Sequence, residues 1–197
     1  MAPMSSKPTD PAVYTENEAQ LLALARASIE HGLRDGTPIG IDLAQYPAPL
    51  REKGASFVTL KHRGELRGCI GSLEPRQPLA EDVAGNAFNA AFRDPRFPPL
   101  GEHELRDIQL HISILTPVEP LPCAGEKDLL DKLRPGRDGL LIEDGHHRAT
   151  FLPAVWESLP DPRLFLRYLK QKAGLPEDYW SDDIKVFRYE TISLGDE

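Results

Sequence analysis

The sequence predicts an α+β fold, in which helices pack against a largely antiparallel sheet. Two apolar runs at residues 56–61 and 66–71 are joined by a very short turn, which indicates a β-hairpin. Apolar and polar residues alternate over residues 107–116, as in a strand with one buried face. Few strand–helix–strand units are visible, and parallel pairing requires such crossover connections, so we expect mainly antiparallel strands.

Composition narrows the class of protein. The chain has 197 residues and a net charge of −8, which counts against nucleic-acid binding, because that depends largely on neutralising phosphates. No apolar run approaches the roughly 20 residues that span a bilayer, and the N-terminus has no apolar signal segment. Two cysteines form neither a metal motif nor a disulfide framework, and no phosphate-binding glycine loop is present. We therefore expect a cytoplasmic protein without membrane association or cofactor.

The order of elements follows from periodicity and capping signals. We expect a leader at 1–13, a single domain at 14–193 and a short tail at 194–197. Thr15 and Glu18 have the spacing of a capping box and predict that the first helix begins there. The remaining expected elements are a helix at 78–92, a strand at 107–116, a helix at 126–133, strands at 139–143 and 146–151, a helical turn at 153–159, a helix at 162–173 and a closing strand at 184–192.

The hairpin carries the chemistry of greatest interest, the segment Leu66-Arg67-Gly68-Cys69-Ile70-Gly71. With Arg63 and Gly64 as a two-residue turn, three facing pairs are expected: His62 with Glu65, Leu60 with Arg67, and Val58 with Cys69. Alternation along the strand then predicts that Arg67 and Cys69 point to the same face.

Two interpretations of this segment stay open. In the functional one, Cys69 is a catalytic candidate whose thiol pKa is lowered by Arg67, while Gly68 and Gly71 let a ligand approach the backbone. In the structural one, Cys69 is a small buried residue, Arg67 pairs with a carboxylate and the glycines serve close packing. Residues 51–76 hold six basic and three acidic residues, a locally positive charge that favours a small anionic ligand.

The proline-stiffened loop at 94–100 adds two candidate ligand-binding residues. Arg96 follows the helix that we expect to pack on the hairpin, so it would reach the face of Arg67 and Cys69 and form an anion site there. Alternatively, Asp94 and Arg96 pair with each other and only fix the loop.

Several segments together resemble the AMMECR domain family, which includes the AmmeMemoRadiSam system protein A of bacteria and archaea. The segment 66–73 is similar to the family's signature, and 94–100, 112–117, 139–155 and 165–180 are similar to further blocks in the same order. The resemblance implies an α+β domain with a mainly antiparallel sheet and a smaller second lobe. It also implies that the protein accompanies a radical SAM enzyme and a Memo-like protein, as members of the family often do. It supplies no catalytic residue and marks only 66–71 and 94–97 as a functional surface.

We therefore expect an accessory component that binds a small anionic metabolite or modified substrate and works with a radical SAM protein and a Memo-like protein. The alternative is an enzyme that uses Cys69 as a nucleophile near Arg67. A nucleic-acid-associated factor ranks third, because the chain is acidic. The sequence leaves open whether the protein is catalytic.

Overall fold

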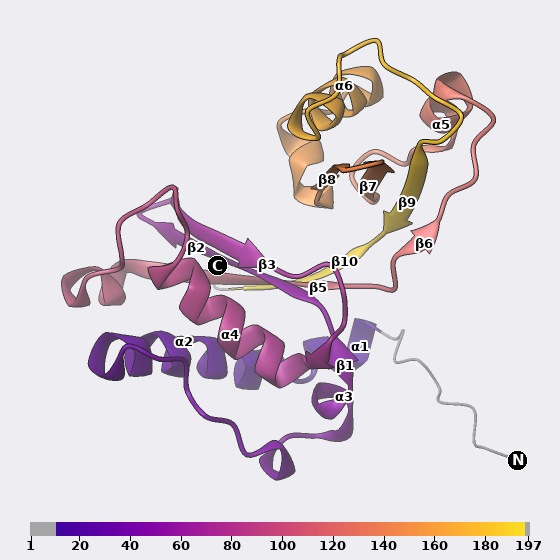
Figure 1. Ribbon diagram of the computed structural model, residues 1–197. Coiled ribbons are helices and arrows are strands. Elements are labelled where there is room, and N and C mark those ends of the chain that lie inside the picture. Colours follow the sequence, from indigo (N-terminus) through magenta and orange to yellow (C-terminus); the bar gives the residue numbers. More distant parts are fainter. Residues whose placement is uncertain (1–10, 196–197) are drawn as a thin grey trace, which may run out of the picture. The chain divides into compact units, whose positions relative to one another are not determined.

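The computed structural model describes residues 11–195 and divides the chain into two compact units (Figure 1). Unit 1 consists of residues 11–115 and 192–195, and unit 2 consists of residues 116–191. Unit 2 is thus an insertion between two strands of unit 1. Among the helices between residues 11 and 195, none has the length and apolar composition of a membrane-spanning segment.

Unit 1 is a four-stranded sheet in the order β10-β5-β2-β3, with two long helices on one of its faces (Figure 1). Both pairings of β2, with β3 and with β5, are antiparallel. Its elements are α1 (Pro11–Thr15), α2 (Glu18–Asp35), η1 (Leu43–Gln45), α3 (Ala48–Arg51), β1 (Lys53–Gly54), β2 (Ser56–His62), β3 (Glu65–Gly71), β4 (Gln77–Pro78), α4 (Leu79–Phe92), η2 (Glu102–Asp107), β5 (Ile108–Leu115) and β10 (Thr191–Gly195).

The alternation of side chains along β2 decides which face of the sheet the helices cover. Val58 and Leu60 are buried, whereas Thr59 between them stays partly exposed. The buried face packs against α2 and α4, whose alanines allow a close approach. Asp82 of α4 accepts hydrogen bonds from the backbone N–H and the hydroxyl of Ser56, at 2.8 and 2.7 Å, and so ties the helix to β2.

Unit 2 is a second four-stranded sheet, in the order β6-β9-β7-β8. β9 pairs antiparallel with both β6 and β7, and β7 pairs antiparallel with β8. Its elements are β6 (Glu119–Pro120), α5 (Glu126–Lys132), β7 (Gly139–Asp144), β8 (His147–Phe151), η3 (Pro153–Glu157), α6 (Pro162–Lys172) and β9 (Lys185–Tyr189). Phe165 of α6 stacks on Trp156 with ring centroids 3.7 Å apart, inside a hydrophobic core of the unit's own.

The predicted α+β class is confirmed, but several boundaries differ. The capping box is wrong: the Thr15 hydroxyl donates to the Pro11 carbonyl within α1, and α2 begins at Glu18. The expected leader overlaps α1, while its first ten residues lie outside the described part of the chain. The closing strand at 184–192 is two strands in different sheets, β9 and β10. Residue 194, expected in the tail, is Leu194, which belongs to β10 and is buried in the core of unit 1.

Candidate functional site

The hairpin of β2 and β3 has the predicted two-residue turn. Arg63 and Gly64 both have positive φ angles, 54° and 84°, as the mirror-image turns that suit twisted hairpins require. His62 lies opposite Glu65, as expected. The local turn chemistry therefore determines how the hairpin closes.

Beyond the turn, a β-bulge changes the register. Lys61 pairs with Leu66 but Leu60 pairs with Gly68, so Arg67 is an extra residue without a partner across the strand. Cys69 consequently lies opposite Thr59 and not opposite Val58 as predicted. One inserted residue reverses the alternation of faces, so the expectation that Arg67 and Cys69 share a face is wrong.

Arg67 is held by a carboxylate. Its Nε and Nη2 donate to the two carboxylate oxygens of Glu104 at 2.7 and 3.0 Å, and the residue is only 9% exposed. Its Nη1 is buried without a hydrogen bond, and its guanidinium carbon lies 5.9 Å from the centre of the Phe97 ring. The hydrogen bond from Arg67 lowers the pKa of Glu104 to about 2. Arg67 thus pairs with a carboxylate, as the structural interpretation of the segment expected.

Both glycines beside Cys69 are positions of close packing. A Cβ atom on Gly68 would overlap the backbone carbonyl of Ala90 in α4, and one on Gly71 would overlap the ring of Phe57. The signature glycines therefore let α4 and an aromatic side chain approach the strand. These contacts account for the glycines without a ligand at the backbone.

Asp94 and Arg96 clamp the main chain of Cys69. The Cys69 N–H donates to Asp94 Oδ2 at 2.9 Å, and Arg96 Nη2 donates to the Cys69 carbonyl at 3.3 Å. Arg96 also pairs with Asp94, with Nε to Oδ1 at 2.9 Å and Nη2 to Oδ2 at 2.7 Å. Because β3 is an edge strand, this clamp covers polar groups that would otherwise be open to another strand. Arg96 thus pairs with Asp94, as one alternative expected, and it also reaches the main chain of Cys69, while the anion site stays a prediction.

The clamp sets the electrostatics around the thiol. The Asp94 side chain is 2% exposed, and the hydrogen bond from Arg96 holds the pKa of its carboxyl well below the usual range. The Arg96 side chain is 54% exposed, and the pKa of its guanidinium is raised chiefly by Asp94 and to a smaller extent by Cys69. The partly buried Cys69 Sγ lies 3.1 Å from Thr59 Oγ1. A thiol, a hydroxyl and an accessible guanidinium therefore come together.

Two contributors to this site were missed in the sequence: Thr59 and Glu104. Thr59 would have been found from the strand alternation if the bulge had been recognised, because it then faces Cys69. Glu104 carries no sequence signal, since it is one of many carboxylates and lies 37 positions from Arg67. Within the part of the chain that the structure describes, no group of three or more His, Cys, Asp or Glu side chains is placed to hold a metal ion.

Comparisons with known proteins place this architecture in a family. A model of the AMMECR1 family matches residues 22–194. A protein of Thermofilum pendens is 40% identical over 92% of this chain and 93% of its own length, and Protein MJ0810 of Methanocaldococcus jannaschii is 42% identical over 84% and 83%. The crystal structure of the uncharacterized protein PH0010 from Pyrococcus horikoshii superposes with a TM-score of 0.83 at 37% identity, covering 89% of each chain. The chain therefore belongs to the AMMECR1 family.

Proposed function

We propose that this protein is an accessory binding component that holds a small anionic metabolite or modified substrate beside Cys69 and presents it to a partner enzyme. The observation that carries this proposal is the clamp, in which Asp94 and Arg96 hold both main-chain polar groups of Cys69. The clamp fixes an exposed guanidinium next to a partly buried thiol, which is a preformed place for an anionic group.

The charges around the thiol narrow the class of ligand. Arg67 is paired with Glu104, and the charge of Arg96 is partly balanced by Asp94. A single accessible guanidinium suits one carboxylate or a similar singly charged group better than a polyphosphate. The ligand is thus a small molecule or a modified side chain with one negative charge.

The proposed partners are a radical SAM protein and a Memo-like protein, on the strength of the family resemblance. The test is copurification of the tagged full-length chain with both proteins from its own organism. Wild type should retain at least one of them, and Arg96→Gln should retain it equally if Arg96 binds only the ligand. Recovery of neither protein at any salt concentration contradicts this part of the proposal.

The ligand site is tested by comparing two alkylating probes, anionic iodoacetate and neutral iodoacetamide. Cys69 and Cys123 are read separately by peptide mass, so Cys123 is an internal control without the clamp. Because Arg96 attracts an anion, the rate ratio of iodoacetate to iodoacetamide should be several-fold higher at Cys69, and Arg96→Gln should abolish the difference. Equal ratios at the two cysteines, or a Cys69 that reacts only after unfolding, would refute the site.

A second candidate function is an enzyme with Cys69 as nucleophile. The contact that favours it is the 3.1 Å distance between Thr59 Oγ1 and the Cys69 sulfur. At this distance the hydroxyl can exchange a hydrogen bond with the sulfur of the nucleophile. Alkylation with iodoacetamide from pH 5 to 9 separates the two functions. Rapid reaction of Cys69 well below the ordinary thiol pKa of about 8.5 favours the enzyme, and slow reaction there favours the binding component.

A further inference from the structure

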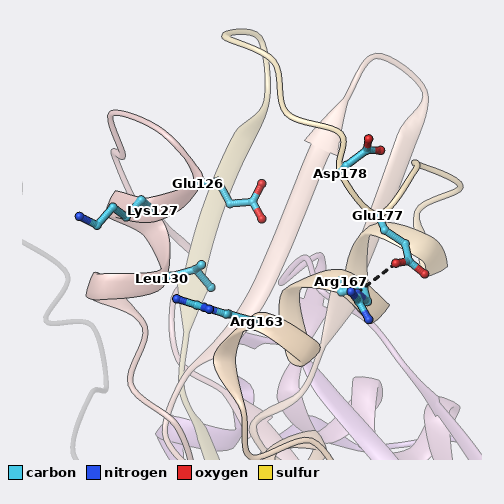
Figure 2. A pocket seen from close by; sticks show the side chains of 7 residues that line it. All are labelled: Glu126, Lys127, Leu130, Arg163, Arg167, Glu177 and Asp178. Atoms are coloured by element: carbon cyan, nitrogen blue, oxygen red, sulfur yellow. Dashed lines mark ion pairs between the residues drawn. The ribbon is translucent and has the colours of Figure 1, made fainter.

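Unit 2 contains a hollow that plays no part in the Cys69 site. It is formed by α5, by one side of α6 and by the segment that follows α6, and its volume is about 490 Å³ (Figure 2). Sites for drug-sized ligands have volumes of roughly 300–1,000 Å³, so the hollow is larger than a single small ion requires. All of its lining residues lie within unit 2.

A buried charge joins two of the residues that line the hollow. Lys170 is 0% exposed, and its Nζ donates to Glu126 Oε2 at 2.8 Å and to the Glu177 carbonyl at 3.1 Å. A buried ammonium is unfavourable unless it is paired and hydrogen-bonded, and here its partners come from α5 and from the segment after α6. One side chain of α6 therefore joins both walls, which makes the hollow a preformed feature.

The lining carries equal numbers of opposite charges: Lys127, Arg163 and Arg167 against Glu126, Glu177 and Asp178. Arg167 pairs with Glu177 at 3.1 Å, and Glu126 pairs with Lys170. By contrast, Lys127, Arg163 and Asp178 have no side-chain ion pair within residues 11–195, and the ammonium of Lys127 points away from the other lining side chains (Figure 2). Figure 2 shows Arg163 and Asp178 on opposite sides of the Glu126 carboxylate, with the Arg163 guanidinium beneath Leu130. Arg163, an unpaired cation, and Asp178, an unpaired anion, thus line the same hollow.

This arrangement selects against ligands with charges of one sign. A nucleotide or other polyanion would meet three carboxylates, and a polyamine would meet three basic side chains. We propose that the hollow binds a short peptide segment with one acidic and one basic side chain, the acidic one at Arg163 and the basic one at Asp178. Leu130 offers an apolar contact for the aliphatic part of such a peptide.

The experiment is an NMR titration of the ¹⁵N-labelled full-length protein with three blocked tripeptides. N-acetyl-Lys-Gly-Asp-amide carries both charges, whereas the Lys-Gly-Lys and Asp-Gly-Asp analogues carry one sign. The mixed peptide should shift amides of α5, α6 and residues 177–178 and bind about tenfold more tightly than either analogue. Equal affinity for all three peptides, or shifts confined to other parts of the chain, would overturn the proposal.

Two variants test the two ends of the ligand separately. Arg163→Gln and Asp178→Asn should each weaken binding of the mixed peptide about five- to tenfold. Arg76→Gln is the matched control, because Arg76 is an exposed arginine of unit 1 that pairs with Glu74, and it should leave the affinity unchanged. Unchanged binding in both unit 2 variants contradicts the assignment. Free glycine is the last arm: if it saturates the same shifts at the same concentration, the site takes a free amino acid and not a peptide.

Discussion

Gly68 shows how strictly the sheet and α4 fit together. A Cβ atom at this position would overlap the carbonyl of Ala90, and a helix backbone cannot move aside as a flexible side chain can. We therefore predict that Gly68→Ala lowers the free energy of unfolding by about 2–3 kcal/mol, measured by urea denaturation. Gly85→Ala is the matched control: it lies in α4 with open space around it and should raise stability by about 0.5–1 kcal/mol. Equal effects of the two changes would contradict this packing.

The pair of Arg67 and Glu104 should make stability depend on acidity. The pKa of Glu104 is lowered from its ordinary value of 4.5 to about 2 in the folded protein, chiefly by the hydrogen bond from Arg67. A carboxyl with a depressed pKa stabilises the fold above its unfolded pKa, and this contribution is lost as the pH falls from about 4.5 to 2. It amounts to about 1–2 kcal/mol once solvent screening is allowed for.

Glu104→Gln tests this pair in the same titration. The variant should be less stable than wild type at pH 7, and its stability should fall less steeply between pH 5 and 2, as measured by urea denaturation at each pH. Wild-type and variant curves that run parallel across this range would show that Glu104 is not the titrating group.

At the scale of elements, the turn of the β2–β3 hairpin contains a residue in an unfavourable conformation. Arg63 has a φ of 54°, a region that asparagine and glycine adopt more readily. Arg63→Asn should therefore raise the thermal midpoint by a few degrees, equivalent to about 0.5–1 kcal/mol, although it removes an exposed contact with Asp107. Gly64→Ala should have the opposite effect, since φ at that position is 84°. A gain in stability from Gly64→Ala would contradict the turn geometry.

The elements that the sequence predicted correctly are those set by local patterns. The turn at Arg63 and Gly64, helix α4 and strand β5 follow from turn chemistry, from four-residue spacing and from strict alternation. The bulge could not be predicted, because it lets Arg67 reach Glu104 and brings Gly68 against Ala90, contacts that only the folded chain makes. The side of the sheet to which each site residue points depends on the extra residue of the bulge, Arg67. The sequence therefore identified the segment of the site but not the arrangement of its side chains.

At the scale of the whole molecule, the chain leaves unit 1 after β5 and returns to it through β10. The two connecting segments meet at Thr116 and Glu190, where the Thr116 N–H donates to the Glu190 carbonyl at 2.9 Å and the Glu190 N–H donates to the Thr116 hydroxyl at 2.8 Å. In the sequence, residues 184–192 looked like one strand because apolar and β-branched residues recur on both sides of Glu190. Which sheet each half joins depends on partners elsewhere in the chain.

The two units have separate hydrophobic cores, and this should be visible in their local stability. Leu110 of β5 and Leu140 of β7 are both almost completely buried, each in the cluster of its own unit. Truncation of a buried leucine lowers stability by about 2–5 kcal/mol. Because the two leucines belong to different clusters, the loss of stability in one unit should not pass to the other. Leu140→Ala should therefore speed hydrogen–deuterium exchange in β7 and β9 while β2 keeps its protection, and Leu110→Ala should do the reverse, read by peptide mass. Each variant is the control for the other, and a uniform loss of protection in both would mean that the units unfold as one cooperative structure.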